Sequence, residues 1–565
     1  MGAAEKIQQL PSELHGITSL KELGEPVKAY SVREFGVADK FLNDIAILEC
    51  VDRTNQQRSI YYILINEESE TIRKELPAIR NAKNFLIPLT GERRPKRLLV
   101  KRDLIINALQ LESRTKSNFV NDNERVREID KMFEEADKLK ASDIHISSNA
   151  DRSAIMFRVN GELELWGSER NQQELFELVK VLYSSLAAED GTIDGEQFKE
   201  TEQQDGVIYR NIGKKRLGGR ITSHPTDQTD KSFRMVIRVL GDQLAVVQRI
   251  QLENLGFAFN QPEIVRASLN GKGLLLIIGE TNSGKSVTQQ NCLMEIDEKA
   301  GGTKSIYSME NPIERYVDGI EQFSISASGT QSEQDTTIRT EKLLKFFWRA
   351  DPDVLALGEI RDKMTSSAAV QMALTGHSVF STLHCESPFD AFERLTALGA
   401  NAGVLVGSKI IKCVVAQKLV QKICPTCSVG IETLKNPTAN QLTALNEMAS
   451  MGLGRFIKNV RFRNPDSNHQ CENKECRHGI VGRELIAECV SYTTDIGTKL
   501  KDGNKEQAKV NWLKNSGYSK EDVAIHKIKL GLIDPASAID AFETIQSTFN
   551  LREKYNIEHP RNIYG

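Results

Sequence analysis

The stretch Leu274-Leu275-Leu276-Ile277-Ile278-Gly279-Glu280-Thr281-Asn282-Ser283-Gly284-Lys285-Ser286 decides the fold of this chain. Its apolar beginning predicts a buried strand, and the remainder follows the pattern G-x-x-x-x-G-K-S. In such a loop the backbone N–H groups turn inward around a phosphate, and the two glycines allow the tight path. We expect Lys285 to bind the β- and γ-phosphates and the Ser286 hydroxyl to ligate Mg²⁺. The pattern therefore predicts a site for a nucleoside triphosphate.

The residues after this loop support the same interpretation. Val287 to Glu295 predict a helix, whose positive N-terminal end would face the bound anion. The alternative is a chance glycine-rich turn. The motif requires a strand directly before the loop and a helix directly after it, and a chance turn predicts neither.

The composition indicates a multidomain globular protein. Its 565 residues are too many for one core and predict about three or four domains. Lys plus Arg (74) nearly balance Asp plus Glu (77), so the overall charge does not favour nucleic acid as a partner. The apolar runs are shorter than the ~20 residues that span a bilayer, and the N-terminus has no apolar signal core. Nine cysteines are too few for a disulfide scaffold of this size and indicate a reducing cytosol.

Shifts in composition predict the domain boundaries. Strand-like runs at 45–50 and 60–65, mixed with helical stretches, predict an α+β domain at the N-terminus. A polar stretch from Ser113 to Asn123 predicts a linker, and the Asn160-Gly161 turn between strand-like runs belongs to a second domain. The predicted segments are 1–113 (a partner-docking domain), 114–124 (linker), 125–245 (second domain), 246–420 (domain of the phosphate loop), 421–490 (cysteine-bearing, metal-binding subdomain) and 491–565 (C-terminal helical region).

Two acidic residues follow further strands of the predicted sheet. Glu310 ends one strand-like run, and Glu359 ends another. Parallel strands present their C-terminal ends to the ligand crevice, so both carboxylates can approach the γ-phosphate and its metal. The alternative, a pair of surface carboxylates, does not explain why both residues end buried strands. A third strand lies between His377 and His384.

The order of these blocks resembles the type II secretion and type IV pilus ATPase family of hexameric secretion motors. The resemblance covers about residues 125–490, and its most specific parts are Gly358 to Asp362, Thr375 to His377 and Ser381 to His384. It implies an α/β fold with a RecA-like P-loop NTPase domain. A smaller α+β (PAS-like) domain and an N-terminal α+β domain would precede it, and a four-cysteine metal-binding insert would follow.

The resemblance also implies roles for individual residues. Glu359 corresponds to the Walker B glutamate, Glu310 and Glu314 to an acidic box, and His377 and His384 to a histidine box. The nucleotide-binding set that it implies is Gly279, Thr281, Asn282, Ser283, Gly284, Lys285, Ser286, Val287, Glu314, His377 and His384.

Arginines from the second domain complete the expected catalytic set. Arg220 and Arg238 align with family arginines that reach the neighbouring subunit's nucleotide. Such an arginine contributes ~10³ to 10⁵ in rate in related NTPases, and it makes hydrolysis depend on how two domains sit. The two strand-end glutamates are expected to orient or deprotonate the attacking water. Asn311 stands where the family usually has Asp, and Gly358 stands where other P-loop enzymes place an Mg²⁺-ligating Asp.

Four cysteines downstream have the residue types of a tetrahedral zinc site. The spacing of the second pair is longer than the Cys-x-x-Cys that the family usually has, so His469 or His478 is an alternative ligand. Four reduced structural thiols are the alternative to a metal. The candidate ligands are Cys424, Cys427, Cys471 and Cys476.

The resemblance implies a cytoplasmic homohexamer that associates peripherally with the inner membrane and acts on a membrane-embedded platform protein. We expect it to power type IV pilus assembly, with some likeness to the type IVb branch. The alternatives are a type II secretion motor, a scaffold that binds ATP and barely hydrolyses it, and a DNA-translocating motor, against which the balanced charge argues.

Overall fold

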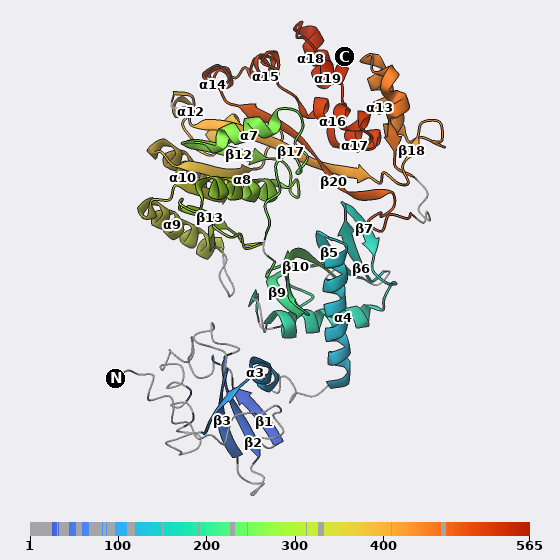
Figure 1. Cartoon of the computed structure of the whole chain (residues 1–565). Coiled ribbons are helices and arrows are strands. Elements are labelled where there is room, and N and C mark those ends of the chain that lie inside the picture. The colour runs from blue at the N-terminus through green and yellow to red at the C-terminus, as the bar shows by residue number, and fades with distance from the viewer. Residues whose placement is uncertain are drawn as a thin grey trace. The chain divides into compact units, whose positions relative to one another are not determined.

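The chain divides into two compact units, residues 1–125 and 126–565 (Figure 1). The structure is a computed structural model, and it describes residues 25–30, 32, 44–51, 59–66, 82, 86, 96–109, 119–149, 152–188, 192–195, 197–226, 232–245, 247–311, 313–325, 333–407, 409–464 and 471–564.

The first unit contains a four-stranded sheet in the order β1-β2-β3-β4 (Figure 1). Neighbouring strands pair antiparallel except β3 and β4, which are parallel. Helix α3 buries Leu104, Ile105 and Ala108 against this sheet. The strands predicted at 45–50 and 60–65 are confirmed. The bounds are β1 Glu25–Tyr30, β2 Ile45–Val51, β3 Ser59–Asn66, β4 Lys96–Val100 and α3 Arg102–Leu109.

The second unit begins with a small domain built on a seven-stranded sheet in the order β7-β6-β5-β11-β10-β9-β8. Helix α4 packs Ile129, Met132 and Phe133 into its core. The β6–β7 hairpin turns at Asn160 (φ 51°) and Gly161 (φ 93°), both in the left-handed region that such tight turns need. The bounds are α4 Phe119–Lys138, β5 Asp143–Ser148, β6 Ala154–Val159, β7 Glu162–Leu165, α5 Gln172–Lys180, the π-helix η5 Val181–Ala187, β8 Thr192–Ile193, β9 Gln204–Ile212, β10 Lys215–Pro225 and β11 Phe233–Asp242.

Helix α4 begins inside the segment that the sequence predicts as a linker. The described part of that segment, residues 119–124, is helical and continuous with the domain that follows. Of the polar residues that suggested a linker, Asn121, Asp122 and Asn123 lie on this helix.

The larger domain is built on a second seven-stranded sheet in the order β14-β13-β15-β16-β12-β17-β20. All neighbouring strands are parallel except β20, which runs antiparallel to β17, so the expected mixed α/β fold with a mainly parallel sheet is confirmed. The bounds are β12 Gly273–Ile278, β13 Ile306–Glu310, β14 Glu321–Ser324, β15 Val354–Glu359, β16 Ser378–Leu383, β17 Ile411–Ile423 and β20 Ile480–Ser491.

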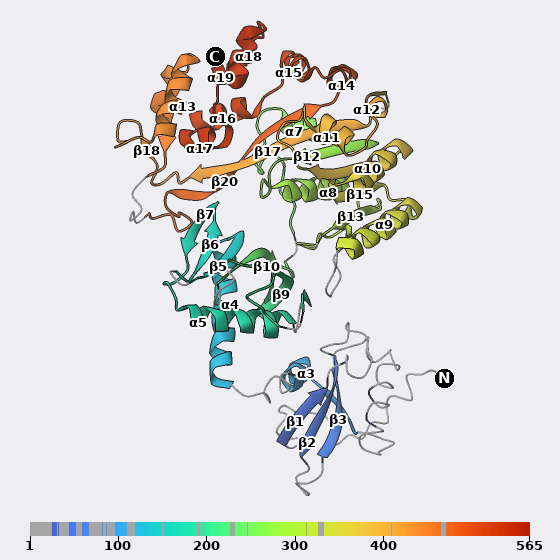
Figure 2. The ribbon, with the colours of Figure 1, turned by 180° about the vertical axis from the view of Figure 1, so that it is seen from behind.

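Helices cover both faces of this sheet (Figures 1 and 2). Alternate side chains of β12 enter the two cores: Leu276 and Ile278 pack with α9, α10 and α11, and Leu275 and Ile277 pack with α7 and α8. Each fully buried Leu or Ile contributes about 1.5–3 kcal/mol. The bounds are α7 Gln261–Leu269, α8 Lys285–Ala300, α9 Glu333–Ala350, α10 Lys363–Thr375, α11 Ala391–Ala397 and α12 Ala402–Gly407.

The cysteine-bearing segment leaves the sheet between β17 and β20. The predicted boundaries at 420/421 and 490/491 fall inside or beside these two strands, because the chain returns to the sheet through β20 before it continues. The segment outside the sheet is residues 424–479, with β18 Val429–Gly430, α13 Ala439–Ser450, the 3-10 helix η6 Gly454–Asn459 and β19 Arg461–Phe462.

The C-terminal helices belong to two different cores. Residues of α14 and α15, among them Leu500 and Trp512, pack into the core of the large sheet. Ile525 of α16 and Ile539 of α17 instead pack with Met448 of the insert. Asp534 caps α17: its side chain accepts from the backbone N–H of Ala536, and Pro535 follows at the first helical position. The bounds are α14 Thr494–Lys501, α15 Lys505–Lys514, α16 Lys520–Lys529, α17 Pro535–Phe542, α18 Ser547–Lys554 and α19 Arg561–Tyr564.

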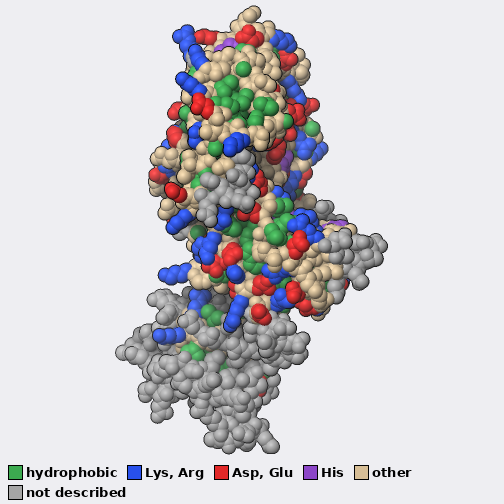
Figure 3. All heavy atoms as spheres, turned by 90° about the vertical axis from the view of Figure 1, so that its right-hand side faces the viewer, with side chains coloured by type: hydrophobic (Ala, Val, Ile, Leu, Met, Phe, Trp, Pro, Cys, Tyr) green, Lys and Arg blue, Asp and Glu red, His purple; other side chains and the backbone are tan. Residues whose placement is uncertain are grey.

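The surface is mixed in charge. On the face seen in Figure 3, Lys and Arg side chains alternate with Asp and Glu, and hydrophobic side chains gather on its upper part. Within the described part of the chain, no helix combines the length and the apolar character that crossing a bilayer requires.

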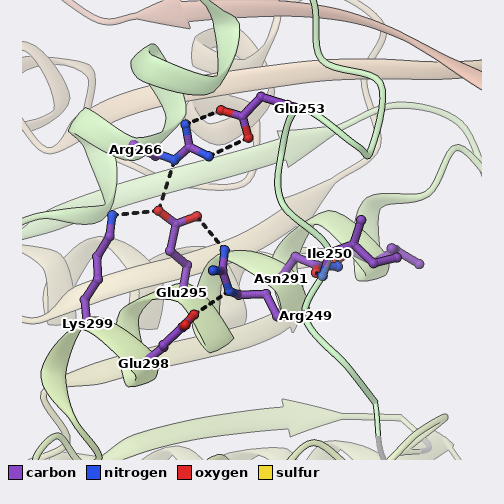
Figure 4. A network of polar contacts seen from close by, with 9 residues as sticks. Arg249, Ile250, Glu253, Arg266, Asn291, Glu295, Glu298 and Lys299 are labelled. Carbon is purple, nitrogen blue, oxygen red and sulfur yellow. Dashed lines mark hydrogen bonds and ion pairs between the residues drawn. The ribbon is translucent and has the colours of Figure 1, made fainter.

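The buried carboxylate of Glu295, on helix α8, binds the chain segment that connects the two domains of the second unit (Figure 4). Glu295 accepts from Arg249 of the connection at 3.5 Å, from Arg266 of α7 at 3.1 Å and from Lys299 at 2.6 Å. The backbone N–H of Ile250 donates to the side chain of Asn291 on the same helix. The helix that starts at the phosphate loop is thus bonded directly to the chain segment that leads to the small domain.

We expect Glu295→Gln to lower the free energy of unfolding by about 2 kcal/mol, because it removes the buried charge that Arg249, Arg266 and Lys299 share and leaves the two arginines only the more exposed Glu298 and Glu253. Glu298→Gln is the matched control: its carboxylate also pairs with Arg249, at 2.6 Å, but its side chain is 65% exposed, against 4% for Glu295. Urea unfolding of both variants measures the difference. Equal stability of the two variants would contradict the importance of the buried carboxylate.

Candidate nucleotide-binding site

The loop between β12 and α8 has the backbone shape that its glycines allow. Gly279 has φ 144° and Gly284 has φ 86°, and a Cβ atom on Gly279 would lie 2.3 Å from the carbonyl oxygen of Gln417. Lys285 Nζ donates to the carbonyls of Gly279 (2.8 Å) and Glu280 (2.6 Å). Burial lowers the pKa of Lys285, and the Glu359 carboxylate acts in the opposite direction.

The loop forms one wall of a cavity of about 510 Å³, a size in the range of small-molecule sites. The other walls come from both domains of the second unit. Most of the predicted residues line this cavity, namely Arg220, Arg238, Thr281, Asn282, Ser283, Gly284, Lys285, Ser286, Val287, Glu310, Glu314, Glu359 and His384, together with Asn311 and Gly358.

Glu359 lies at the end of β15, where a register shift between Leu357 and Glu359 interrupts the pairing with β16. A Cβ atom on Gly358 would lie 2.7 Å from the carbonyl oxygen of Met309 on β13, which leaves no room for an aspartate there. Glu359 accepts a hydrogen bond from Arg361 Nε at 2.6 Å, and its other oxygen lies 3.0 Å from His384 Nε2. The carboxylate is therefore held in one orientation.

Glu310 lies at the end of the neighbouring strand, β13. It accepts from Ser308 Oγ at 2.7 Å and from Gln322 Nε2 at 2.8 Å. Burial raises the pKa of Glu310, while these two hydrogen bonds lower it. Glu310 and Glu359 thus approach the cavity from adjacent parallel strands, as their positions in the sequence predict.

Arg220 and Arg238 face each other across the β10–β11 pair, and both line the cavity. Arg238 Nε donates to Asp143 of β5 at 3.3 Å. The two guanidinium groups thus lie in the cavity that holds the loop of their own chain. A contribution to a neighbouring subunit's nucleotide stays a prediction.

The structure separates the two predicted histidines. His384 follows β16 and lines the cavity beside Glu359. His377 precedes the same strand, at the opposite edge of the sheet, where Thr375 Oγ1 and the carbonyl of Met372 lie within 3.1 Å of its Nδ1. It is not among the described residues that line the cavity.

Several residues that line the cavity were not among those predicted from the sequence. Arg483 Nη1 donates to the carbonyl of Asn282 in the loop at 3.1 Å, and Arg361 lies beside Glu359. Thr336 and Thr340 line the cavity from the start of α9. Arg483 ends a Gly-x-x-Gly-Arg stretch, Gly479 to Arg483, after the last cysteine of the cluster, and nothing local connects that stretch with the loop.

The four predicted cysteines come together in the insert, with all sulfur atoms within 4.8 Å of one another. The Sγ atoms of Cys424 and Cys471 lie 3.7 Å apart, as do those of Cys427 and Cys476. Four thiolates at ~2.3 Å from a tetrahedral zinc ion would lie about 3.8 Å from one another, so the donor set fits zinc.

His478, one of the two histidines considered as substitutes, does not replace a thiol in this set. His478 Nε2 instead lies 3.9 Å from a carboxylate oxygen of Glu164. His469 lies outside the described residues. The longer spacing between Cys471 and Cys476 therefore closes the cluster without a histidine.

Comparison with known proteins gives one consistent result. The family described as Type II/IV secretion system protein matches residues 120–539. Type II secretion system protein E of Pseudomonas aeruginosa is 29% identical over 411 residues, which cover 72% of this chain and 73% of that protein. Type II secretion system ATPase E of Vibrio cholerae is 34% identical over 313 residues, covering 55% of this chain and 57% of that protein.

Solved structures give similar matches at lower identity. The ATPase DotB of Legionella pneumophila aligns at 19% identity with a TM-score of 0.48, over 73% of this chain and 95% of that chain. The pilus retraction motor PilT with bound ADP aligns at 20% identity with a TM-score of 0.45, over 74% and 97%. Because the family match runs without interruption from α4 to α17 and covers more than half of the sequence, this chain belongs to the Type II/IV secretion system protein family.

Proposed function

We propose that this protein is an ATPase that hydrolyses ATP to ADP and phosphate and converts the reaction into movement of its domains. The observation that carries the proposal is the cavity in which the loop, Glu359 and the two arginines of the small domain lie together. These are the parts that phosphoryl transfer needs: phosphate binding, a group that orients water, and positive charge for the transition state.

Individual residues of the site have separate roles in the proposed hydrolysis. Mg²⁺ bound at Ser286 would neutralise phosphate charge. Lys285 uses two of its three N–H donors on loop carbonyls, and its ammonium group would bind the β- and γ-phosphates. Glu359, held by Arg361, orients the attacking water and accepts its proton, and Glu310 assists from the adjacent strand.

The arginines connect the reaction to domain position. Arg220 and Arg238 belong to the small domain, whereas the loop and Glu359 belong to the large one. They can neutralise transition-state charge only when the two domains lie close together, so nucleotide state and domain arrangement depend on each other. A scaffold that binds ATP without hydrolysing it would not need these groups beside Glu359, and we therefore favour the motor.

We propose that the chain forms a hexamer that works in a type II secretion system, at the cytoplasmic side of the inner membrane and against a membrane-embedded platform protein. The names of the curated relatives favour this system. Type IV pilus assembly, which the sequence suggested first, is the second candidate, because the cysteine insert and a long N-terminal region are typical of assembly motors. Binding of purified residues 1–113 to the platform protein of each system, measured side by side, distinguishes the two.

Glu359→Gln is expected to lower ATP turnover by about 10² to 10⁴, because it removes the basic oxygen and keeps the shape of the side chain. The affinity for ATP should stay near that of the parent. Lys285→Ala should instead weaken binding itself. Phosphate release and nucleotide titration measure the two effects, and parental turnover by Glu359→Gln would refute the role of this carboxylate.

Arg220→Ala and Arg238→Ala are each expected to lower turnover by at least about 10², given the contribution of such arginines in related enzymes. Arg234→Ala is the matched control, since Arg234 lies on the same strand as Arg238 but does not line the cavity. The resemblance implies that these arginines act on a neighbouring subunit's nucleotide, whereas the cavity of the single chain, which both arginines line, favours action on the chain's own nucleotide. We therefore expect that mixing either variant with Glu359→Gln does not restore activity. Recovery on mixing would instead assign the arginines to a neighbouring subunit's nucleotide.

Zinc analysis of protein purified without added metal should give close to one zinc per chain. Cys427→Ala should release the metal and lower the stability of the insert, because structural zinc supplies folding energy. Cys413→Ala is the control, since that buried thiol lies in the core of the large sheet. A metal-free protein with an ordered insert would favour four reduced thiols.

A further inference from the structure

Gln417 on β17 is buried and uses both ends of its side-chain amide on the phosphate loop and its helix. Its Nε2 donates to the carbonyl oxygen of Ser283 at 2.7 Å. Its Oε1 accepts from the hydroxyl of Thr288 on α8 at 3.0 Å. The Gln417 residue is only 3% exposed, so water cannot easily replace either bond.

Gly279 and Gly284 of the loop both lie close to Gln417. A Cβ atom on Gly279 would lie 2.3 Å from the Gln417 carbonyl oxygen, and one on Gly284 would lie 3.2 Å from its Nε2. The glycines are thus required by the approach of β17 as well as by the phosphate. Both ends of the loop pack against one residue of the neighbouring strand.

The hydrogen bond from Gln417 to the Ser283 carbonyl fixes the orientation of the Ser283–Gly284 peptide. The peptide unit between Ser283 and Gly284 is planar and trans, so its C=O and N–H groups point in opposite directions. When Gln417 holds the carbonyl on the side of β17, the N–H of Gly284 is turned the other way, and Gly284 lines the cavity.

Gln417 differs from Lys285, which also holds loop carbonyls. Lys285 bonds Gly279 and Glu280, but it is also the cation that the phosphates need, so its N–H donors are shared between the loop and the nucleotide. The amide of Gln417 contacts no group that we assign to the phosphates, and it can hold the loop in both states.

We propose that Gln417 is a positioning residue for nucleotide binding: it fixes the Ser283–Gly284 peptide so that the Gly284 N–H is presented to the phosphates. The inference rests on the proposed function of the loop. Gln417 thus affects nucleotide affinity through the loop backbone, and it takes no part in activating water.

Gln417→Met tests the inference, because methionine keeps the length and volume of the side chain and loses both hydrogen bonds. Loss of one such buried bond is expected to raise the Kd for ATP and for ADP by about tenfold, with KM rising more than kcat falls. Titration with a fluorescent ATP analogue measures the affinity without turnover.

Gln261→Met is the matched control. It makes the same change at another buried glutamine, whose side chain donates to the carbonyl of Ala487 and accepts from the backbone N–H of Ala258, away from the loop. Its Kd should stay near the parental value. If Gln417→Met binds nucleotide as tightly as the parent, or if both variants lose the same affinity, the inference fails while the proposed function stands. If the parent itself binds no nucleotide, the proposed function fails.

Gln417→Glu gives a second readout that simple loss of packing would not change. At high pH the carboxylate has no proton to donate to Ser283, whereas the protonated acid at low pH can donate again and still accept from Thr288. The ratio of variant to parental Kd should therefore fall as the pH is lowered from 8 to 6, and a constant ratio would contradict the inference. The parent carries the same charged neighbours of the loop, so their titration cancels in the ratio: Glu280, Lys285, Glu359, Lys418 and Arg483.

Discussion

The backbone of the phosphate loop is the constraint on which the rest of the structure depends. Its carbonyl groups are held from three directions: Ser283 by Gln417 on β17, Asn282 by Arg483 on β20, and the first residues of the loop by Lys285. The strand beside β12 therefore determines the shape of the loop as much as the glycines do. The order of strands in the sheet, with β17 next to β12, brings these residues together.

The same strand continues from the loop toward the other domains. Beyond Gln417, β17 carries Gln421, which bonds Glu162 of the small domain, and it ends directly before Cys424. Arg463 of the insert forms a two-pronged ion pair with Glu162, at 2.6 and 3.0 Å, which lowers the pKa of this carboxyl. A change in the position of the small domain would thus act on Arg463 and Gln421 as well as on the arginines of the cavity. These contacts give the proposed motor a physical connection between the reaction and domain movement.

The sequence predicted those parts of the site that depend on local pattern. The buried strand, the loop and α8 follow from adjacent residues, and Glu310 and Glu359 could be placed because parallel strands end at one edge of a sheet. Gln417 could not be found in this way, because it lies 134 residues from the carbonyl that it holds. Residues 480–491 form β20, an antiparallel strand of the large sheet. The predicted segment 421–490 therefore includes a strand of that sheet. The resemblance grouped His377 with His384 in one histidine box, although the two residues lie at opposite ends of β16.

The most direct measurement of the central claim is an experimental structure of the full chain with Mg²⁺ and a non-hydrolysable ATP analogue. The account predicts the triphosphate on the loop, with its γ-phosphate among Lys285, Glu359 and the two arginines of the same chain. Nucleotide bound elsewhere, or a γ-phosphate out of reach of Glu359 with the loop occupied, would contradict it.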